Sequence, residues 1–303
     1  MFIIYVNDLS LHLTNCFIVQ YADDTQILIE GSINDLENLI ERAEDILMRA
    51  KIYFQKNGLL LNESKTQCIF IGSRQFISQI GDEVSINFNG NILKPSKEVK
   101  NLGVYFDRYM TFESHIDRIY KKVMGTLIYL NRVKDFFEPA TRVIVVQSLA
   151  LSLINYCLKV WGSTQAVHLN KAQKVQNFAV RVAIGNVRKY DHVSPFYKDL
   201  EWLRVKDKYF YDVCILTFKI LRNFLPDWLY TFETVHSVSN ISTRQRDNLI
   251  VRRTYTNIGA RDFNIRGAIF WNTLPQEVRE INSLSNFKAK LRNYLLNGRS
   301  LTA

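Results

Sequence analysis

Two adjacent aspartates stand between two apolar runs near the start of this 303-residue sequence. Phe17–Gln20 leads into the string Tyr21–Asp24, and Thr25–Ile29 follows it. This pattern predicts a β-hairpin that carries Asp23 and Asp24 at its tip. Because neighbouring carboxylates repel each other and Mg²⁺ prefers oxygen ligands, the pair is suited to one half of a two-metal site for phosphoryl transfer. The same string also occurs in solvated surface turns.

A long helix is expected after the hairpin. Asn34 with Glu37 three positions later is a capping pattern, and apolar residues recur at helical spacing up to Ala50. Asn57 and Gly58 form a typical helix stop. Two extended segments are then expected, a buried strand and a short hairpin or strand: Cys68–Ile71 and Val99–Asp107.

The second half of the sequence is predicted to be mainly helical. Thr111 can cap a helix whose apolar stripe runs to Leu130. Pro139 suits the first turn of the next helix, which is expected to be mostly buried over Arg142–Tyr156. A third helix should end at Gly185.

Short segments resemble, in chain order, parts of the reverse transcriptases of non-LTR retrotransposons, above all the Jockey-like and related LINE groups. The segments are Phe2–Leu9, Tyr21–Asp24, Leu61-Asn62 with Lys65-Thr66, and Leu102-Gly103-Val104 with Phe112 and His115-Ile116. They are similar to the end of the helix before the catalytic hairpin, the YxDD hairpin, the LNxxKT segment and the primer-grip hairpin that leads into the thumb.

The resemblance implies an α+β fold in three parts. Residues 1–98 would form a partial polymerase palm with the YADD hairpin, residues 99–135 the primer-grip hairpin and a helical thumb, and residues 136–303 a mostly helical basic region. The implied activity is RNA-directed DNA polymerisation by two-metal nucleotidyl transfer. Its implied partners are an RNA template, a DNA primer, deoxynucleoside triphosphates and Mg²⁺.

On the family pattern, Asp23 would be the main metal ligand and Asp24 would support it. Tyr21 and Ala22 would lie under the primer end. Lys65 is a candidate general acid, because a lysine there could give a proton to the pyrophosphate leaving group. An exposed lysine at the start of a strand is the other interpretation of Lys65.

Primer and template contacts are expected at the next segments. Leu102 and Gly103 belong to the resembled primer grip. Arg118, Lys121 and Lys122 lie largely off the apolar stripe of the thumb helix, where they could follow a duplex backbone through phosphate contacts. A solvated helix face would carry the same residues.

The last part of the chain resembles the region that follows the polymerase in these elements. The matching positions are Trp161-Gly162, Arg252–Thr254, Gly259, Phe263, Arg266–Ala268, Trp271–Pro275, Ser283–Lys288, Leu291 and Tyr294–Leu296. Trp161 and Trp271 are expected in the core, since their neighbours are apolar. The arginines of the Ser/Asn/Thr-rich stretch could clamp RNA or lie in a solvated loop: Arg244, Arg246, Arg252 and Arg253.

The net charge of +10 is divided unevenly along the chain. Residues 1–98 carry 8 basic and 13 acidic side chains, a balance of −5, whereas residues 99–303 carry 31 and 16, a balance of +15. A basic second half favours binding to nucleic-acid phosphates, with affinity that falls as salt rises. Ordinary surface solvation could explain part of this charge.

Several classes of protein are disfavoured by the sequence. The four cysteines have no CxxC pairing and the five histidines no ligand spacing, which argues for a reducing compartment and against a zinc knuckle. No signal peptide is recognisable. The most apolar stretch, Val143–Leu158, is shorter than the roughly 20 residues that span a bilayer. We therefore expect an intracellular protein of cytoplasm or nucleus, neither secreted nor transmembrane.

The resemblance also implies a further palm aspartate and fingers upstream of Met1. The sequence is therefore expected to be the C-terminal portion of a longer reverse transcriptase, with weak or absent Mg²⁺ binding by this chain alone. The alternative is a catalytically dead remnant that binds nucleic acid. Whether the chain itself is an enzyme is left open by the sequence.

Overall fold

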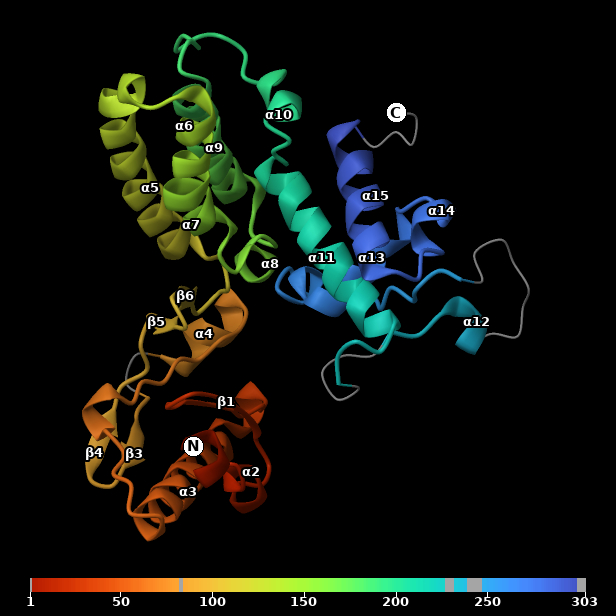
Figure 1. Ribbon diagram of the computed structural model, residues 1–303. Coiled ribbons are helices and arrows are strands. Elements are labelled where there is room, and N and C mark those ends of the chain that lie inside the picture. The colour runs from red at the N-terminus through yellow and green to blue at the C-terminus, as the bar shows by residue number, and fades with distance from the viewer. Residues whose placement is uncertain (1, 82–83, 227–231, 239–246, 299–303) are drawn as a thin grey trace. The chain divides into compact units, whose positions relative to one another are not determined.

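Helices and small antiparallel sheets make up the chain, which is compatible with the expected α+β class. The computed structural model describes residues 2–81, 84–226, 232–238 and 247–298. Two units are distinguished: unit 1 is Met1–Leu102 with Phe106–Tyr109, and unit 2 is Gly103–Tyr105 with Met110–Ala303. Figure 1 shows the elements of both.

Unit 1 contains short helices, hairpins and one long helix. The helices are α1 (Phe2–Tyr5), α2 (Leu9–His12), the 3₁₀ turn η1 (Ile33–Asp35), α3 (Leu36–Lys56), the 3₁₀ turn η2 (Glu63–Lys65) and α4 (Arg74–Ile80). The strands are β1 (Phe17–Tyr21), β2 (Asp24–Leu28), β3 (Ile86–Phe88) and β4 (Asn91–Leu93). A further hairpin, β5 (Glu98–Asn101) and β6 (Val104–Asp107), contributes residues to both units. β1–β2, β3–β4 and β5–β6 each form a two-stranded sheet.

The core of unit 1 gathers on one face of α3. Ile46 and Ala50 are buried there with Leu9 of α2, and Ile18 and Ile27 of the β1–β2 hairpin pack against this cluster. The helical spacing of the apolar residues on α3 and the alternation in the strands bring these side chains to a common side. The hairpin is therefore held by its inward face on a helix.

Two details of unit 1 differ from the sequence expectation. Cys68–Ile71 is not a strand; Cys68 accepts one hydrogen bond from Ser96 N at 2.8 Å, and a single bond makes no ladder. The helix cap is not Asn34, because Ser32 Oγ accepts the Asn34 N–H at 3.3 Å and opens η1 before α3. One error concerns the start of a helix and the other the pairing of a strand, and a local sequence pattern defines both poorly.

Among the described residues of unit 2, the regular secondary structure is helical apart from its residues of the β5–β6 hairpin and a single β-bridge. Its longer helices are α5 (Glu113–Val133), α6 (Pro139–Val146), α9 (Ala166–Ile184), α11 (Val205–Leu221), α13 (Phe263–Asn272) and α15 (Leu284–Leu296). Its short elements are η3 (Lys134–Phe136), the π-helical η4 (Gln147–Leu151), α7 (Ser152–Asn155), α8 (Leu158–Trp161), α10 (Phe196–Asp199), α12 (Val235–Val238), η5 (Gly259–Arg261) and α14 (Gln276–Arg279).

The described helices of unit 2 pack into two groups. α5 and α6 lie against α9, and α11 lies against α13 and α15 (Figure 1). Trp161 and Trp271 are both buried, which confirms the expectation that they belong to the core. Phe287 stacks between Phe218, at 4.4 Å, and Trp271, at 5.8 Å between ring centroids. No helix among the described residues combines the length and the apolar character that crossing a bilayer requires.

The segment Arg142–Tyr156 is less buried than the sequence suggested. It runs from α6 through the π-helical turn η4 into α7, and Ile144 and Leu149 face solvent. Val146 and Ala150 lie on its buried side. Ile144 lies opposite Val146 on α6, so the segment presents an apolar exposed face as well as a core face.

Arg142 closes the C-terminal end of α9 from the side. Its Nε and Nη2 donate hydrogen bonds to the carbonyl oxygens of Ala183 and Ile184, both at 2.7 Å, and Lys134 Nζ donates to Gly185 O at 2.8 Å. These carbonyls have no partner within the helix, and the cations also suit its negative end. Gly185 has φ +90°, and a Cβ there would lie 2.8 Å from the guanidinium.

Replacing Arg142 with methionine should lower the free energy of unfolding by about 2–3 kcal/mol, because buried carbonyls would lose charged hydrogen bonds. Urea denaturation followed by circular dichroism measures this change. Arg132→Met, at an exposed arginine in the last turn of α5, is the matched control and should change stability by less than about 0.5 kcal/mol. Equal stability of both variants would show that the Arg142 contacts contribute little.

Candidate functional site

The Asp-Asp string lies at the tip of the β1–β2 hairpin. The two strands pair antiparallel from Phe17 with Leu28 to Tyr21 with Asp24. Ala22 and Asp23 are therefore the two central residues of the turn, and Asp24 is the first residue of β2. Ala22 has φ +53°, at a position where hairpin turns usually carry glycine. A non-glycine residue held there is strained, as turns at functional sites often are.

The carboxylates of Asp23 and Asp24 both face solvent. Neither Asp23 nor Asp24 receives a side-chain hydrogen bond or ion pair from the residues that the structure describes. Two neighbouring negative charges with free oxygen donors match what a hard divalent cation takes. Across the same described residues, however, no group of three or more His, Cys, Asp or Glu side chains is placed to hold a metal ion. The pair fits part of a Mg²⁺ site, whose other ligands would include substrate phosphates.

The outward face of β1 is apolar and exposed. Phe17, Val19 and Tyr21 are 51%, 42% and 63% exposed, while Ile18 between them faces the core cluster. Side chains of a strand alternate between its faces, so the exposed set lies on one side of the hairpin. The surface beside the carboxylates is thus suited to contact with another apolar or aromatic surface.

Lys65 lies in a turn that Asn62 organises. Asn62 Oδ1 accepts the Lys65 N–H at 3.2 Å and the Ser64 hydroxyl at 2.7 Å, and Thr66 Oγ1 donates to Asn62 O at 3.1 Å. The Lys65 side chain is exposed, and no hydrogen bond or ion pair within the described part of the chain joins it to Asp23 or Asp24. The geometry therefore explains the Leu-Asn-x-x-Lys-Thr pattern as a turn.

Glu63 in the same turn was not singled out by the sequence. Its carboxylate accepts a hydrogen bond from Lys51 Nζ at 2.9 Å and from the side-chain amides of Asn89 and Asn91. The Lys51 hydrogen bond is the main reason why the pKa of Glu63 is lowered. Glu63 joins η2 to α3 and to the β3–β4 hairpin, and this depends on contacts that no local pattern reveals.

A second group that the sequence analysis missed is centred on Asp8, within the Phe2–Leu9 segment. The Tyr53 hydroxyl donates a hydrogen bond to Asp8 Oδ1, and His12 Nε2 lies 3.6 Å from the same carboxylate. The hydrogen bond from Tyr53 is the main cause of a lowered pKa at Asp8, and burial is the main cause that raises the pKa of Tyr53 to about 12. Asp8 is thereby held as a carboxylate on the segment just before the hairpin.

The predicted primer-grip residues form the turn of the β5–β6 hairpin. Leu102 and Gly103 have φ +44° and +85°, so both central positions of the turn are left-handed. A turn of this kind matches the twist of the paired strands. Within unit 1, Gln26 Nε2 of β2 donates to Asn101 Oδ1 of β5 at 2.8 Å. This bond ties the carboxylate hairpin to the strand that leads into the Leu102–Gly103 turn.

The three basic residues predicted on the thumb helix lie on the exposed side of α5. Arg118 has its guanidinium 4.2 Å from the centroid of the Tyr105 ring and its Nε donates to Ser114 Oγ at 3.3 Å. For Lys121 and Lys122 the structure records no side-chain hydrogen bond or ion pair within the residues it describes. Two of the three cations are thus available to a ligand, and the third is held over an aromatic ring.

His115 lies on the buried side of α5. Its Nδ1 accepts the Tyr105 N–H at 3.4 Å, and its ring meets Trp161 edge-on at 5.9 Å. Nε2 is buried and has no partner among the described residues. Burial lowers the pKa of His115 to about 4 from its usual 6.5, so the imidazole is neutral at physiological pH.

The stability of unit 2 should therefore fall as pH drops from about 6.5 to about 4. The unfolded chain takes up a proton at His115 in this range and the folded chain does not, which costs up to about 3 kcal/mol at roughly 1.4 kcal/mol for each pKa unit. Urea denaturation at pH 7 and pH 4.5 measures the loss. His115→Phe cannot take up that proton, so its loss should be smaller. An identical pH dependence in both proteins would show that His115 titrates normally.

The arginine cluster of the C-terminal region is described only in part. Arg244 and Arg246 lie outside the described residues. Arg252 and Arg253 are exposed; Arg252 Nη2 lies 3.4 Å from Glu233 Oε2, and the Arg253 guanidinium lies 5.6 Å from the Tyr255 ring centroid. The exposed ion pair is of the weak kind, so it leaves Arg252 able to exchange partners.

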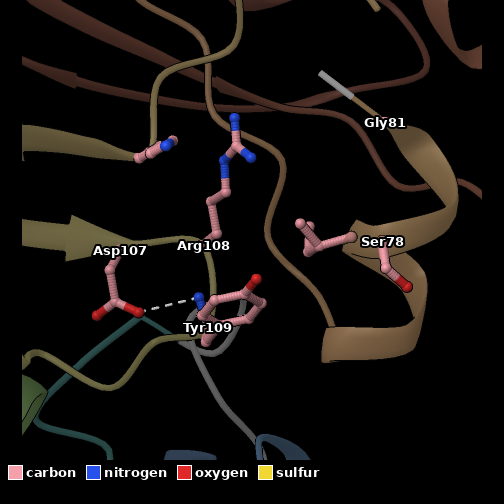
Figure 2. A pocket seen from close by; sticks show the side chains of 7 residues that line it. Ser78, Gly81, Asp107, Arg108 and Tyr109 are labelled. Carbon is pink, nitrogen blue, oxygen red and sulfur yellow. Dashed lines mark hydrogen bonds between the residues drawn. The ribbon is translucent and has the colours of Figure 1, made fainter. Parts of the chain in front are cut away.

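A cavity of about 440 Å³ in unit 1 contains none of the predicted site residues. Its lining is Ile77, Ser78, Gly81, Lys97, Asp107, Arg108 and Tyr109 (Figure 2). The Arg108 side chain donates to Ser96 O and Pro95 O at 3.2 and 3.0 Å, and Asp107 Oδ1 accepts the Tyr109 N–H at 3.0 Å. The side chains of Arg108 and Asp107 thus bind backbone atoms and stabilise the loops around the cavity.

Curated proteins with similar sequences are polymerases of mobile elements. The chain is 25% identical over 173 residues to the RNA-directed DNA polymerase from mobile element jockey of Drosophila funebris. The match covers 55% of this chain and 18% of that protein. The protein of the same name from Drosophila melanogaster is 22% identical over 194 residues, 63% of this chain and 20% of that protein.

A relative from a different element gives a similar result. The retrovirus-related Pol polyprotein from type-1 retrotransposable element R1 of Bradysia coprophila is 25% identical over 189 residues, 59% of this chain and 18% of that protein. The chain spans about a fifth of the length of the curated relatives it matches. No protein-family model matches the chain, and no solved structure matches it significantly. The chain is thus related to the reverse transcriptases of Jockey-like non-LTR retrotransposons.

Proposed function

We propose that this chain supplies part of the palm, the thumb and a C-terminal nucleic-acid-binding region of an RNA-directed DNA polymerase. Residues 1–98 would form the palm portion, residues 99–135 the primer grip and thumb, and residues 136–303 the basic helical region. The observation that carries the proposal is the exposed Asp23–Asp24 pair at a strained hairpin tip, in a chain whose curated relatives are such polymerases.

Asp23 and Asp24 would hold the catalytic metal in the proposed site. Mg²⁺ bound there would stabilise the charge that develops on the transferred phosphoryl group. The chain's own part is to present two unpaired carboxylates on a hairpin fixed to α3 by Ile18 and Ile27. A fixed hairpin holds the backbone of both aspartates in one place, which limits where their oxygens can meet a Mg²⁺ ion.

Primer, template and nucleotide would contact residues around this tip. Tyr21 and Ala22 would lie under the primer end, and the exposed apolar face of β1 supports a contact surface there. Lys65 would give a proton to the leaving pyrophosphate. Its exposed ammonium group is free to move, which such a role requires.

Leu102 and Gly103 would grip the primer strand from the turn of the β5–β6 hairpin. The exposed cations of α5 would meet phosphates of the RNA–DNA duplex: Arg118, Lys121 and Lys122. The balance of +15 over residues 99–303 supports that binding. Arg252 and Arg253 would bind RNA further along the chain, with Arg244 and Arg246 as members of the same proposed clamp.

Nucleic-acid binding without catalysis is the second candidate function. It is favoured by one observation: the described residues hold no cluster of three or more metal-ligating side chains. A two-carboxylate pair alone would bind Mg²⁺ weakly. Under this alternative the basic surface of unit 2 would still bind phosphates.

A chimera separates the two candidates. This chain would replace the segment it matches in the Drosophila funebris jockey polymerase, and incorporation of deoxynucleotides would be measured on an RNA template with a DNA primer. The polymerase proposal expects template-directed incorporation. A chimera that folds and binds template–primer but incorporates nothing would favour binding without catalysis.

A further inference from the structure

The segment Val251–Ile258 has no helix or strand and is nevertheless fixed at both ends. Asn272 of α13 holds Leu249, two residues before this segment, by two hydrogen bonds. Its Oδ1 accepts the Leu249 N–H and its Nδ2 donates to Leu249 O, both at 2.8 Å. At the other end, Arg261 Nη1 donates to Met110 O at 2.8 Å and its Nε to Asn257 O at 3.0 Å. Side chains from distant parts of unit 2 thus position this loop.

The inside of the loop is also ordered by its own residues. Thr256 Oγ1 accepts the Gly259 N–H at 3.0 Å, and Arg261 N donates to Ile258 O at 2.9 Å. Leu249, two residues before the loop, is buried in the core cluster of α11, α13 and α15. A loop held in this way loses little conformational entropy when it binds a ligand.

The side chains that this loop presents to solvent are two cations and an aromatic ring. Arg252 and Arg253 are exposed, and the Tyr255 ring is 88% exposed beside the Arg253 guanidinium. The sequence from Val251 to Arg261 contains three arginines and no acidic residue. Glu233 is the one carboxylate recorded beside these cations within the described residues, and its exposed pair with Arg252 can give way to a phosphate.

We propose that Val251–Ile258 is a binding loop for a single-stranded polynucleotide. Arg252 and Arg253 contact successive phosphates, and Tyr255 stacks on a base. A tyrosine face can stack only on a base that has left its duplex, whereas a duplex would present only its backbone to the loop. The inference rests on the proposed nucleic-acid function and adds to it a ligand class and the residue Tyr255.

Asn272 and Arg261 are positioning residues in this proposal. Each acts on the loop backbone, Asn272 through Leu249 and Arg261 through Asn257, and neither is needed to touch the ligand. The matched pattern Trp271–Pro275 therefore has a structural task next to the arginine loop. Its Asn272 holds Leu249, just before the loop, against the core.

Fluorescence anisotropy of a labelled oligouridine of about 12 nucleotides, titrated with the full chain over a salt series, tests the proposal. Tyr255→Ala should weaken binding about 5- to 100-fold and leave the salt dependence unchanged, because a stacking contact is lost and no charge is. Tyr255→Trp should retain binding. Arg252→Gln with Arg253→Gln should lower the slope of log affinity against log salt by about 1.4, at about 0.7 for each phosphate.

Tyr190 provides a matched control. It is also 88% exposed, and Lys189 Nζ lies 5.6 Å from its ring centroid, but Asp191 follows it directly. Tyr190→Ala should bind the oligouridine as the unchanged chain does. Equal weakening by Tyr190→Ala and Tyr255→Ala would overturn the proposal, since any exposed aromatic would then serve.

The other outcomes are equally decisive. An unchanged affinity of Tyr255→Ala overturns the stacking assignment while leaving the proposed polymerase role intact. A duplex of the same length whose affinity Tyr255→Ala weakens as much as that of the single strand overturns the assignment to single strands. An oligothymidine of equal length shows whether the ligand is RNA or either polynucleotide, and tight binding of both supports the proposal. No binding of the unchanged chain even at low salt would overturn the loop and the nucleic-acid function together.

Discussion

Asp23→Ala should lower RNA-templated DNA synthesis by the jockey chimera about a thousandfold. Asp23 is at the centre of the hairpin turn, and its carboxylate has no other partner among the described residues. A lost metal ligand removes several kcal/mol of charge stabilisation in the transition state, and ~4 kcal/mol corresponds to about 10³ in rate. Single-turnover extension of a labelled primer measures this loss separately from product release.

Matched variants show whether the loss belongs to the metal site. Asp24→Ala should also damage synthesis, and Lys65→Ala should slow turnover while template binding is kept. Asp45→Ala removes an exposed carboxylate whose recorded partner is Arg49, one turn away on α3, and should leave the rate unchanged. Normal synthesis by the Asp23→Ala chimera would exclude Asp23 as a catalytic ligand.

The 303-residue chain expressed alone should bind template–primer but extend no primer with Mg²⁺ or Mn²⁺, because among its described residues no third metal-ligating side chain is grouped with Asp23 and Asp24. Template-dependent incorporation by this chain that Asp23→Ala abolishes would contradict the incomplete-site interpretation.

Salt should have the second large effect. The affinity of the chain for an RNA–DNA duplex should fall by at least about a hundredfold between roughly 50 and 200 mM salt, if about six phosphates are contacted. Changing Arg118, Lys121 and Lys122 together to glutamine should lower the slope of log affinity against log salt by about 2–3, at 0.7–0.9 for each phosphate. Anisotropy titrations at several salt concentrations measure both quantities.

Three exposed lysines of unit 1 give the control for this slope. Lys56, Lys94 and Lys97 removed together change the net charge by the same amount, but they lie in residues 1–98, whose balance is −5. Their loss should leave the slope nearly unchanged. Binding that does not depend on salt would show that the basic face of α5 serves solubility alone.

The local sequence pattern was sufficient to predict those strands and helices that depend mainly on neighbouring residues. Two apolar runs around Tyr21–Asp24 predicted paired strands, and β1 and β2 pair there. Val99–Asp107 was expected as a hairpin or strand, and β5 and β6 form it. Pro139 does begin a helix, since its fixed φ suits the first turn.

Contacts between residues far apart in the sequence could not be predicted from local pattern. Glu63 meets Lys51 and Asn91, and Tyr53 meets Asp8, through pairings that depend on the fold as a whole. The same limit explains Cys68–Ile71, where an apolar run suggested a strand but the described residues provide no partner strand. The expectation that Arg142–Tyr156 is mostly buried was wrong, because the segment packs on one face only and leaves Ile144 and Leu149 exposed.

The candidate site shows the same division. Sequence singled out the carboxylates, Lys65 and the α5 cations as candidates, because each has a recognisable pattern, and their roles stay predictions. It did not identify Tyr255, whose exposure beside Arg253 depends on the bonds that Asn272 and Arg261 make to the loop.

The assignment of the Asp23–Asp24 tip as a catalytic metal site can be tested most directly by locating the metal. Iron(II) is substituted for Mg²⁺ in the chimera bound to template–primer and incoming nucleotide, and added hydrogen peroxide with ascorbate then lets the iron generate hydroxyl radicals that cut the nearby backbone. We predict cleavage at the Ala22–Asp23 turn that disappears in Asp23→Ala and persists in Asp45→Ala. Cleavage confined to other segments, or unchanged in Asp23→Ala, would contradict the assignment.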